Sequence, residues 1–277
     1  MKQNNILKGE TMKKIIVLMI FVMMFIFTTS VFAGPTIDKI KKRGELIIGT
    51  SGDYPPFSVK DKNNKLIGLD IDLGMLIAEA MEVKANIKQM PFTELLDALQ
   101  SGKIDMVISA MTITPKRNTK VFFIGPYYIS SQSVMTTKMT AMSIEKINDI
   151  NKPDFTLAVP GGTTSEIIAK KSVPKAKILI VKDMNEAVKM LLEGKVKAVM
   201  SDTATCAFET IRYKEENIVS TPPMTFEPFG IAISENDPLF SNFLTNVLND
   251  LRGSGDLEIM THKWFKDTSW IKGVPKK

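Results

Sequence analysis

Short apolar runs alternate with amphipathic segments along this chain, and that alternation limits its fold more than any other feature. The order is strand, helix, strand, helix, strand over Glu45–Thr50, Asp70–Met81, Ala85–Met90, Thr93–Gln100 and Asp105–Ser109. In the longer helix the apolar residues recur at helical spacing, and Asp70 is a suitable N-cap. Because each helix can serve as the crossover between two parallel strands, the pattern predicts an α/β fold with a parallel sheet.

The second half of the chain repeats this alternation. Strands and helices are predicted in turn over Phe155–Val159, Thr164–Lys171, Lys177–Val181, Asp183–Glu193 and Lys197–Ser201. The segments Leu99–Ser109 and Leu192–Ser201 also share an order of features: a helix end, Gly-Lys, and a buried strand that ends in serine. Any strand–helix–strand unit has similar features, but the echo favours two similar lobes, each presenting a strand end to a shared cleft.

The boundaries between the lobes follow from where this pattern is interrupted. Phe229–Ile233 is predicted to be a strand that returns to the first lobe, followed by closing helices over Pro238–Leu251 and Leu257–Phe265. We therefore assign residues 34–127 and 230–277 to the first lobe and residues 132–224 to the second. The crossings at 128–131 and 225–229 would form a two-strand hinge that lets the lobes close on a ligand.

Residues 1–33 have the features of an export signal. A basic stretch from Met12 to Lys14 precedes the uninterrupted apolar run Ile15–Phe27, and Val31 and Ala33 fit the small-residue cleavage pattern. The alternative, a membrane anchor, is disfavoured because the run is shorter than the roughly 20 residues that span a bilayer. We expect a true start at Met12, cleavage after Ala33 and a periplasmic location.

Composition argues against several classes of protein. With 277 residues, 44% of them hydrophobic, the chain can bury one large core or two modest ones. The net charge is +6, half of it within the first 14 residues, and the other basic residues are scattered, so no nucleic-acid-binding surface is predicted. Cys206 is the single cysteine and His262 the single histidine. We therefore expect no intrachain disulfide, no metal, no cofactor and no His-dependent catalytic triad.

A polar stretch from Ser109 to Arg117 (SAMTITPKR) follows the third buried strand. Strand ends of this kind present ligands in α/β proteins. Arg117 offers a fixed fork of donors for a carboxylate, and the Thr112 hydroxyl could share the same carboxylate oxygen. The alternative is an ordinary turn with a surface arginine.

The second lobe offers two further candidate segments. Residues 160–164 (PGGTT) lead from a strand into a helix, where glycines and free N–H groups favour an anion. The Gly-Lys-Ser/Thr of a phosphate loop is absent, so a carboxylate is favoured over a nucleotide. Asp202 directly follows a buried strand and needs a cationic partner, such as a ligand ammonium, unless it is a helix N-cap. With Tyr54 and Phe92 as apolar walls, these residues describe an amino-acid pocket between two lobes.

Four segments resemble the periplasmic amino-acid-binding proteins of ABC importers, the polar amino-acid family of solute-binding proteins (family 3). They are residues 49–57 (GTSGDYPPF), 68–73 (GLDIDL), 112–117 (TITPKR) and 263–265 (KWF). The resemblance covers almost the whole mature chain. It implies two Rossmann-like lobes of the periplasmic-binding-protein type II fold and a monomer that is not an enzyme. It also implies that the protein binds a free amino acid and delivers it to an ABC permease in the inner membrane.

The resemblance also implies roles for single residues. Arg117 would clamp the ligand α-carboxylate with help from Thr112 and the backbone at Thr163. Asp202 would take the α-ammonium beside the Ala110 carbonyl, and Tyr54 and Phe92 would sandwich the ligand side chain. The remaining residues expected to bind the ligand lie in the same segments: Ser51, Ser109, Gly162 and Thr164.

Two departures from the family bear on specificity. Many binders of basic or amide amino acids carry an acidic residue where this chain has Ser51, and Asp53 lies two residues later. Some members have a longer polar side chain where this chain has Ser201. Both departures favour a small polar or apolar amino acid as the ligand.

Two alternatives come from other functional classes. Exported cyclohexadienyl (arogenate/prephenate) dehydratases contain segments similar to Gly52–Tyr54 and Pro160–Thr163. The general acid of those enzymes would fall at Ser165, whereas Glu166 is one residue late, which is about 100° around a helix. The other alternative is a ligand-sensing partner of a membrane receptor.

Overall fold

The computed structural model describes residues 35–234 and 237–276. The expected export signal and the expected start at Met12 therefore lie outside the described residues. Within the described residues, no helix is both long enough and apolar enough to cross a membrane.

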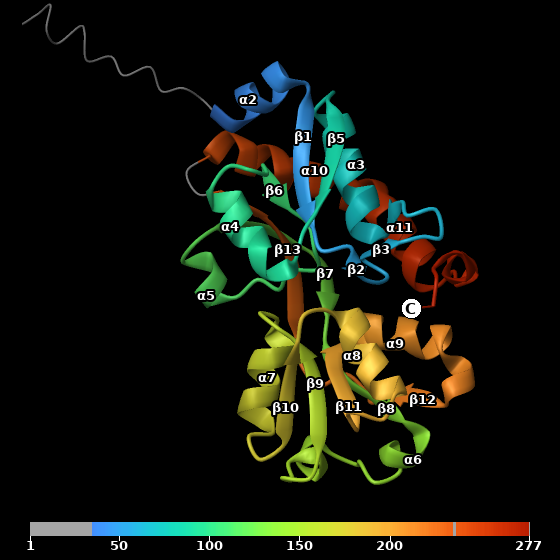
Figure 1. Ribbon diagram of the computed structural model, residues 1–277. Coiled ribbons are helices and arrows are strands. Elements are labelled where there is room, and N and C mark those ends of the chain that lie inside the picture. The colour runs from blue at the N-terminus through green and yellow to red at the C-terminus, as the bar shows by residue number, and fades with distance from the viewer. Residues whose placement is uncertain (1–34, 235–236, 277) are drawn as a thin grey trace, which may run out of the picture. The chain divides into compact units, whose positions relative to one another are not determined.

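The first sheet brings together strands from both ends of the described chain (Figure 1). Its order is β5 (Lys84–Gln89), β1 (Glu45–Thr50), β6 (Met106–Val107), β13 (Glu227–Ile233) and β7 (Phe122–Ser130). The first three strands are parallel, whereas β13 is antiparallel to both of its neighbours. The other elements of this first lobe are α2 (Pro35–Arg43), α3 (Leu69–Ala80), α4 (Leu95–Gln100), α5 (Pro115–Asn118), α10 (Pro238–Ser254), α11 (Asp256–Phe265) and a small sheet of β2 (Asp53–Tyr54), β3 (Ser58–Lys60) and β4 (Leu66–Ile67).

The second sheet has the same arrangement of strand directions. Its order is β10 (Lys177–Val181), β9 (Thr156–Pro160), β11 (Ala198–Asp202), β8 (Gln132–Thr137) and β12 (Ile218–Ser220). Again three parallel strands are followed by an antiparallel one, β8. The helices of this second lobe are α6 (Lys138–Ala141), α7 (Thr164–Ser172), α8 (Met184–Leu192) and α9 (Thr203–Arg212). The expected pair of similar α/β lobes is confirmed, and the two echoing segments end in β6 and β11, the third strand of each sheet.

Several elements differ from the expectation. The strand predicted over Asp105–Ser109 is only Met106–Val107, and the helix predicted from Thr93 starts with a 3-10 turn over Phe92–Glu94. The strands β8 and β12 had not been predicted, and of β7 only the end, within the predicted hinge segment 128–131, had been expected to be strand-like. The helix α9 had been considered only through the N-cap alternative for Asp202. Pro126 within β7 weakens the strand pattern, and it is tolerated because β7 is the edge strand of its sheet.

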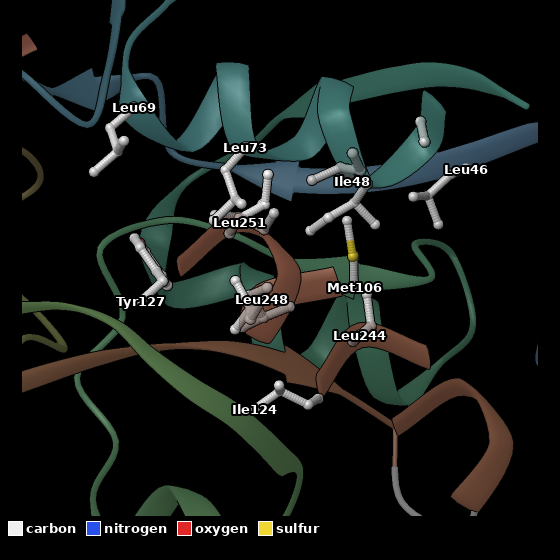
Figure 2. Packing of buried hydrophobic residues seen from close by; sticks show 14 of the residues in the cluster. Leu46, Ile48, Leu69, Leu73, Met106, Ile124, Tyr127, Leu244, Leu248 and Leu251 are labelled. Atoms are coloured by element: carbon white, nitrogen blue, oxygen red, sulfur yellow. The ribbon is translucent and has the colours of Figure 1, made fainter. Parts of the chain in front are cut away.

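The largest core lies between the first sheet and the helices α3, α10 and α11. Figure 2 shows Leu73 of α3, Ile48 of β1 and Leu251 of α10 converging in it. Met106 and Leu244 extend the same core and are fully buried. Burial on the order of 25 cal/mol per Å² of apolar surface makes these contacts the main stabilisation of the first lobe. The second lobe has two smaller apolar clusters, one on each face of its sheet.

The two sheets are connected twice through the backbone, and the C-terminal segment, residues 269–276, also contacts both lobes. Ser131 separates β7 from β8, and residues 221–226 join β12 to β13. The Lys62 N–H of the first lobe donates to the Gly273 carbonyl at 2.8 Å. Trp270 stacks on Phe208 of α9, with the ring centroids 5.2 Å apart.

Candidate functional site

A cavity between the two lobes collects ten of the eleven residues expected to bind a ligand. The ten that line the cavity are Ser51, Tyr54, Phe92, Ser109, Ala110, Thr112, Arg117, Thr163, Thr164 and Asp202. The eleventh, Gly162, does not line the cavity, but its carbonyl accepts a hydrogen bond from Arg117 at 3.1 Å. The residues come from the carboxyl ends of strands in both sheets and from the loops that follow, as expected for α/β lobes.

Arg117 is held by the short helix α5. Thr114 caps this helix by accepting from the Arg117 N–H at 3.2 Å, and Pro115 occupies its first turn. The guanidinium donates to the Thr112 carbonyl at 2.8 Å and lies over the Phe92 ring, 5.4 Å from its centroid. Burial lowers the pKa of Arg117 to about 10, so the side chain remains a cation at neutral pH.

Asp202 ends β11 and is 4% exposed. Its Oδ2 accepts a hydrogen bond from the Tyr54 hydroxyl at 2.5 Å, while its Oδ1 is buried and has no hydrogen-bond partner among the described residues. Burial raises the pKa of Asp202 to about 7. Asp202 occupies the N-cap position of α9, but its side chain makes no capping hydrogen bond, so capping does not account for this carboxylate.

Tyr54 contributes more than the apolar wall that had been predicted. Besides Asp202, its hydroxyl lies 2.7 Å from the Ser201 hydroxyl and accepts from the Asp202 N–H at 3.2 Å. Burial and the charge of Asp202 raise the pKa of Tyr54 well above its ordinary value, so it stays a hydrogen-bond donor. The side chain therefore bridges the two lobes through a polar contact.

The threonines of the two lobes also meet across the cavity. The Thr112 and Thr164 hydroxyls lie 3.3 Å apart. Thr163 caps α7 by accepting from the Glu166 N–H, and its own hydroxyl donates to the Pro160 carbonyl at 2.7 Å. On the first lobe, the Ser109 hydroxyl accepts from the Ser51 N–H at 3.0 Å, which ties the two loops together.

Six lining residues were not among the eleven expected to bind a ligand: Asp53, Pro160, Gly161, Lys182, Asp183 and Met184. Pro160 and Gly161 nevertheless belong to the candidate segment 160–164. Asp53 approaches the second lobe, since its Oδ2 accepts from the Met184 N–H at 3.4 Å. Burial, together with the charge of Asp183, raises the pKa of Asp53. The sequence offers a weak signal for Asp183, which follows a strand and caps α8, whereas nothing local distinguishes Asp53 from a loop residue.

The charges around the cavity are arranged for a zwitterion. A cation, Arg117, and an anion, Asp202, line it from opposite lobes. An α-amino acid carries a carboxylate and an ammonium on one carbon and would satisfy both charges at once. The fold and the cavity together define a two-lobed protein with a ligand site in the cleft.

Comparison with known proteins identifies the family. Residues 46–267 match the model of the bacterial extracellular solute-binding proteins, family 3. The chain belongs to this family. It is 28% identical over 239 residues to the ABC transporter glutamine-binding protein GlnH of Bacillus subtilis (strain 168), with 84% of this chain and 85% of the relative covered.

Two solved structures are similar over most of the chain. The ancestral amino-acid-binding protein AncCDT-1, a precursor of cyclohexadienyl dehydratase, is 40% identical with a TM-score of 0.79, covering 83% of this chain and 99% of its own. A putative ABC transporter binding component from Wolinella succinogenes, complexed with lysine, is 33% identical with a TM-score of 0.80, with 83% and 99% covered. The fold of this chain is accordingly the type II fold of periplasmic amino-acid-binding proteins.

Proposed function

We propose that this protein binds a free amino acid in the cleft and delivers it to an ABC permease. The observation that carries the proposal is the unpartnered, buried Oδ1 of Asp202, which lines the same cavity as Arg117. A buried carboxylate oxygen without a donor is costly, and a ligand ammonium would supply the missing hydrogen bond and charge. The ligand carboxylate would then lie against Arg117, with Thr112 and Thr163 as further donors.

The ligand side chain is expected to be cationic. Asp53 and Asp183 line the cavity from opposite lobes, with Lys182 as the neighbouring cation. Both carboxylates also line an outer hollow that adjoins the cavity and contains Gln89, which gives room for a long side chain. Lys182 already pairs with Asp183 at 3.9 Å, and a cationic ligand side chain would supply the second positive charge for the two carboxylates. This placement of Asp53 favours a different ligand from the small polar or apolar amino acid that Ser51 and Ser201 predict.

We propose that the two lobes close around the ligand. We retain the predicted division into a first lobe of residues 34–127 and 230–277 and a second lobe of residues 132–224. The hinge would be residues 128–131 and 225–229. Binding closes such a cleft to the extent that the ligand prefers the closed state. The family is extracellular, and we propose export through a cleaved signal, a monomeric state and no binding to nucleic acid.

Catalysis of the dehydratase type is disfavoured by the position of Glu166. This carboxylate does not line the cavity; it accepts from the Gly162 N–H at 2.8 Å and pairs with Lys170 at 2.6 Å. The Lys170 contact lowers the pKa of Glu166, which is the wrong direction for a general acid. Ser165 is buried and donates to the Gln132 side chain at 2.7 Å. We therefore propose that the protein is not an enzyme, although AncCDT-1 is described as the precursor of one.

A thermal-shift screen tests this function. Residues 34–277 would be heated with each of the common amino acids, ornithine, arogenate and prephenate, because a ligand of the folded state raises the melting temperature. We expect the largest shifts with L-arginine, L-lysine or L-ornithine, and no loss of arogenate or prephenate.

The matched variant Asp53→Asn separates recognition of the ligand side chain from recognition of its backbone. We expect the variant to lose most of the shift with cationic amino acids while keeping the fold. No shift with any amino acid would contradict the proposed function. A largest shift with a small apolar amino acid, unchanged in Asp53→Asn, would contradict only the cationic side chain.

A further inference from the structure

Asp70 lies next to the cavity without lining it. It belongs to the first turn of α3 and is 1% exposed. Its Oδ1 accepts from the Tyr127 hydroxyl at 2.7 Å, and its Oδ2 accepts from the Ala110 N–H at 2.9 Å. Neither Asp70 nor Tyr127 lines the cavity, whereas Ala110 does. The carboxylate is therefore one hydrogen bond away from the site.

Ala110 has an unusual backbone conformation. Its φ is +46°, in the left-handed region that a residue with a Cβ disfavours. Its N–H is shared between Asp70 and the Tyr127 oxygen, which lies 3.1 Å away. Ala110 is only 6% exposed, so water does not readily replace these acceptors. The strained turn is held where its N–H meets a buried carboxyl group.

The conformation of this turn sets the first lobe's side of the cavity. Ser109 and Thr112, on either side of Ala110, both line the cavity. Ser109 also accepts from the Ser51 N–H, and the Thr112 carbonyl accepts from Arg117. A change in φ at Ala110 would redirect the chain on both sides and disturb these contacts together.

We propose that Asp70 and Tyr127 are positioning residues, which hold the turn at Ala110 in its left-handed conformation so that Ser109, Ala110 and Thr112 face the ligand. The tyrosine fixes the carboxylate, since Tyr127 is anchored in the core of the first lobe (Figure 2). The effect of Asp70 and Tyr127 on affinity rests on the proposed function. Their effect on the backbone at Ala110 is independent of any ligand.

The same helix supplies a matched control. Asp72 is also acidic and also accepts two hydrogen bonds, from Lys263 at 2.6 Å and from the Trp264 ring N–H at 2.8 Å. These contacts join α3 to α11 and do not involve the cavity. Asp72→Asn therefore perturbs the same helix without touching the turn at Ala110.

The experiment compares Asp70→Asn, Tyr127→Phe and Asp72→Asn in residues 34–277. Amide hydrogen exchange at Ala110 is measured first, without ligand. We expect Asp70→Asn to speed this exchange by about 10- to 100-fold, as for loss of a hydrogen bond to a charged group. Tyr127→Phe should speed it less, and Asp72→Asn should leave it unchanged. The affinity for L-arginine, as the probe, should fall in the same order.

A second substitution distinguishes positioning from general support of the fold. Glycine adopts a left-handed φ without steric cost, so Ala110→Gly in the Asp70→Asn background should recover about threefold or more of the lost affinity. Unchanged exchange at Ala110 in Asp70→Asn would overturn the proposal, as would an equal loss of affinity in Asp72→Asn. If the wild-type protein binds no amino acid, the proposed function fails, while exchange at Ala110 still decides the positioning role.

Discussion

At the scale of single residues, Gly162 lies where the backbone of the second lobe packs closely against the first lobe. Its φ is +72°, and a Cβ added there would lie 2.8 Å from the Thr93 methyl group of the first lobe. Glycine is thus required twice, for the backbone conformation and for the space across the cleft. Gly194 offers a control, because its φ is +68° but a Cβ there would meet nothing within 4 Å.

These two glycines give a prediction about closure. Gly162→Ala and Gly194→Ala should each destabilise the fold by about 1–2 kcal/mol through left-handed strain. Only Gly162→Ala should also weaken ligand binding, by about tenfold or more, since a clash of this size opposes close packing of the lobes. Calorimetric titration and thermal unfolding of both variants make the comparison. Equal affinities for the two variants would show that the lobes do not need to approach at Gly162.

How far the site could be predicted also depends on the residue. Arg117 could be found because it lies in the polar stretch that follows a buried strand, and Asp202 because it ends a buried strand with a charge that needs a partner. Asp53 could not be assigned, since its place in the cavity depends on how β2 meets the start of α8 in the other lobe. Asp70 was predicted only as an N-cap, which was wrong because Gly68 occupies that position and Asp70 lies within the first turn of α3. Its contact with Ala110 joins residues 40 apart in the chain.

At the scale of elements, the regular strand–helix alternation could be predicted, and the parts held by tertiary contacts could not. The strands β1, β9 and β10 coincide with apolar runs, whereas β7 and β8 carry the polar residues and proline of a connection. The C-terminal segment, residues 269–276, has no periodic pattern. It is ordered by contacts with α9, where Arg212 donates to the Pro275 carbonyl and Val274 is buried beside Phe208.

Deleting residues 269–277 should therefore destabilise the protein. The loss includes the stacking of Trp270 on Phe208 and a partner of Arg212, whose side chain is 4% exposed and paired with buried Glu209. Removing a fully buried tryptophan costs about 3–5 kcal/mol, and Trp270 is partly buried. With the loss of buried Val274 and of the Arg212 contact, the deletion should lower the free energy of unfolding in urea by about 3 kcal/mol.

The shorter deletion of residues 276–277 is the control. It removes Lys276, whose cation–π contact with Tyr213 is a surface interaction at 5.6 Å. Loss of such a contact costs about 0.5–1 kcal/mol. If both deletions changed the unfolding free energy equally, the C-terminal segment would not be the structural link between the lobes that its contacts indicate.

At the scale of the whole molecule, pH should move stability and ligand affinity in opposite directions. Burial raises the pKa of Asp202, Asp70 and Glu209 to about 7 each, above their ordinary values near 4. Between about pH 4 and pH 7 the folded state therefore binds more protons than the unfolded state. This contribution to stability is present at low pH and is lost as pH rises through about 7.

The unliganded protein should accordingly melt at a higher temperature at pH 5.5 than at pH 8. Exposed carboxylates with a lowered pKa act in the opposite sense, but only near and below their ordinary pKa of about 4. Scanning calorimetry across this range tests the sign. Ligand binding should show the reverse trend, because the ammonium of an amino acid requires Asp202 to be ionised.

Calorimetric titration of L-arginine into residues 34–277 at pH 8 and pH 6 tests the central claim most directly. With the pKa of Asp202 raised to about 7, we predict one bound molecule per chain and an affinity up to about tenfold higher at pH 8. Agmatine, which lacks the carboxylate that Arg117 would bind, should give no measurable heat at either pH. Binding of agmatine as tightly as arginine, or no binding of arginine at either pH, would contradict recognition of an amino acid between Arg117 and Asp202.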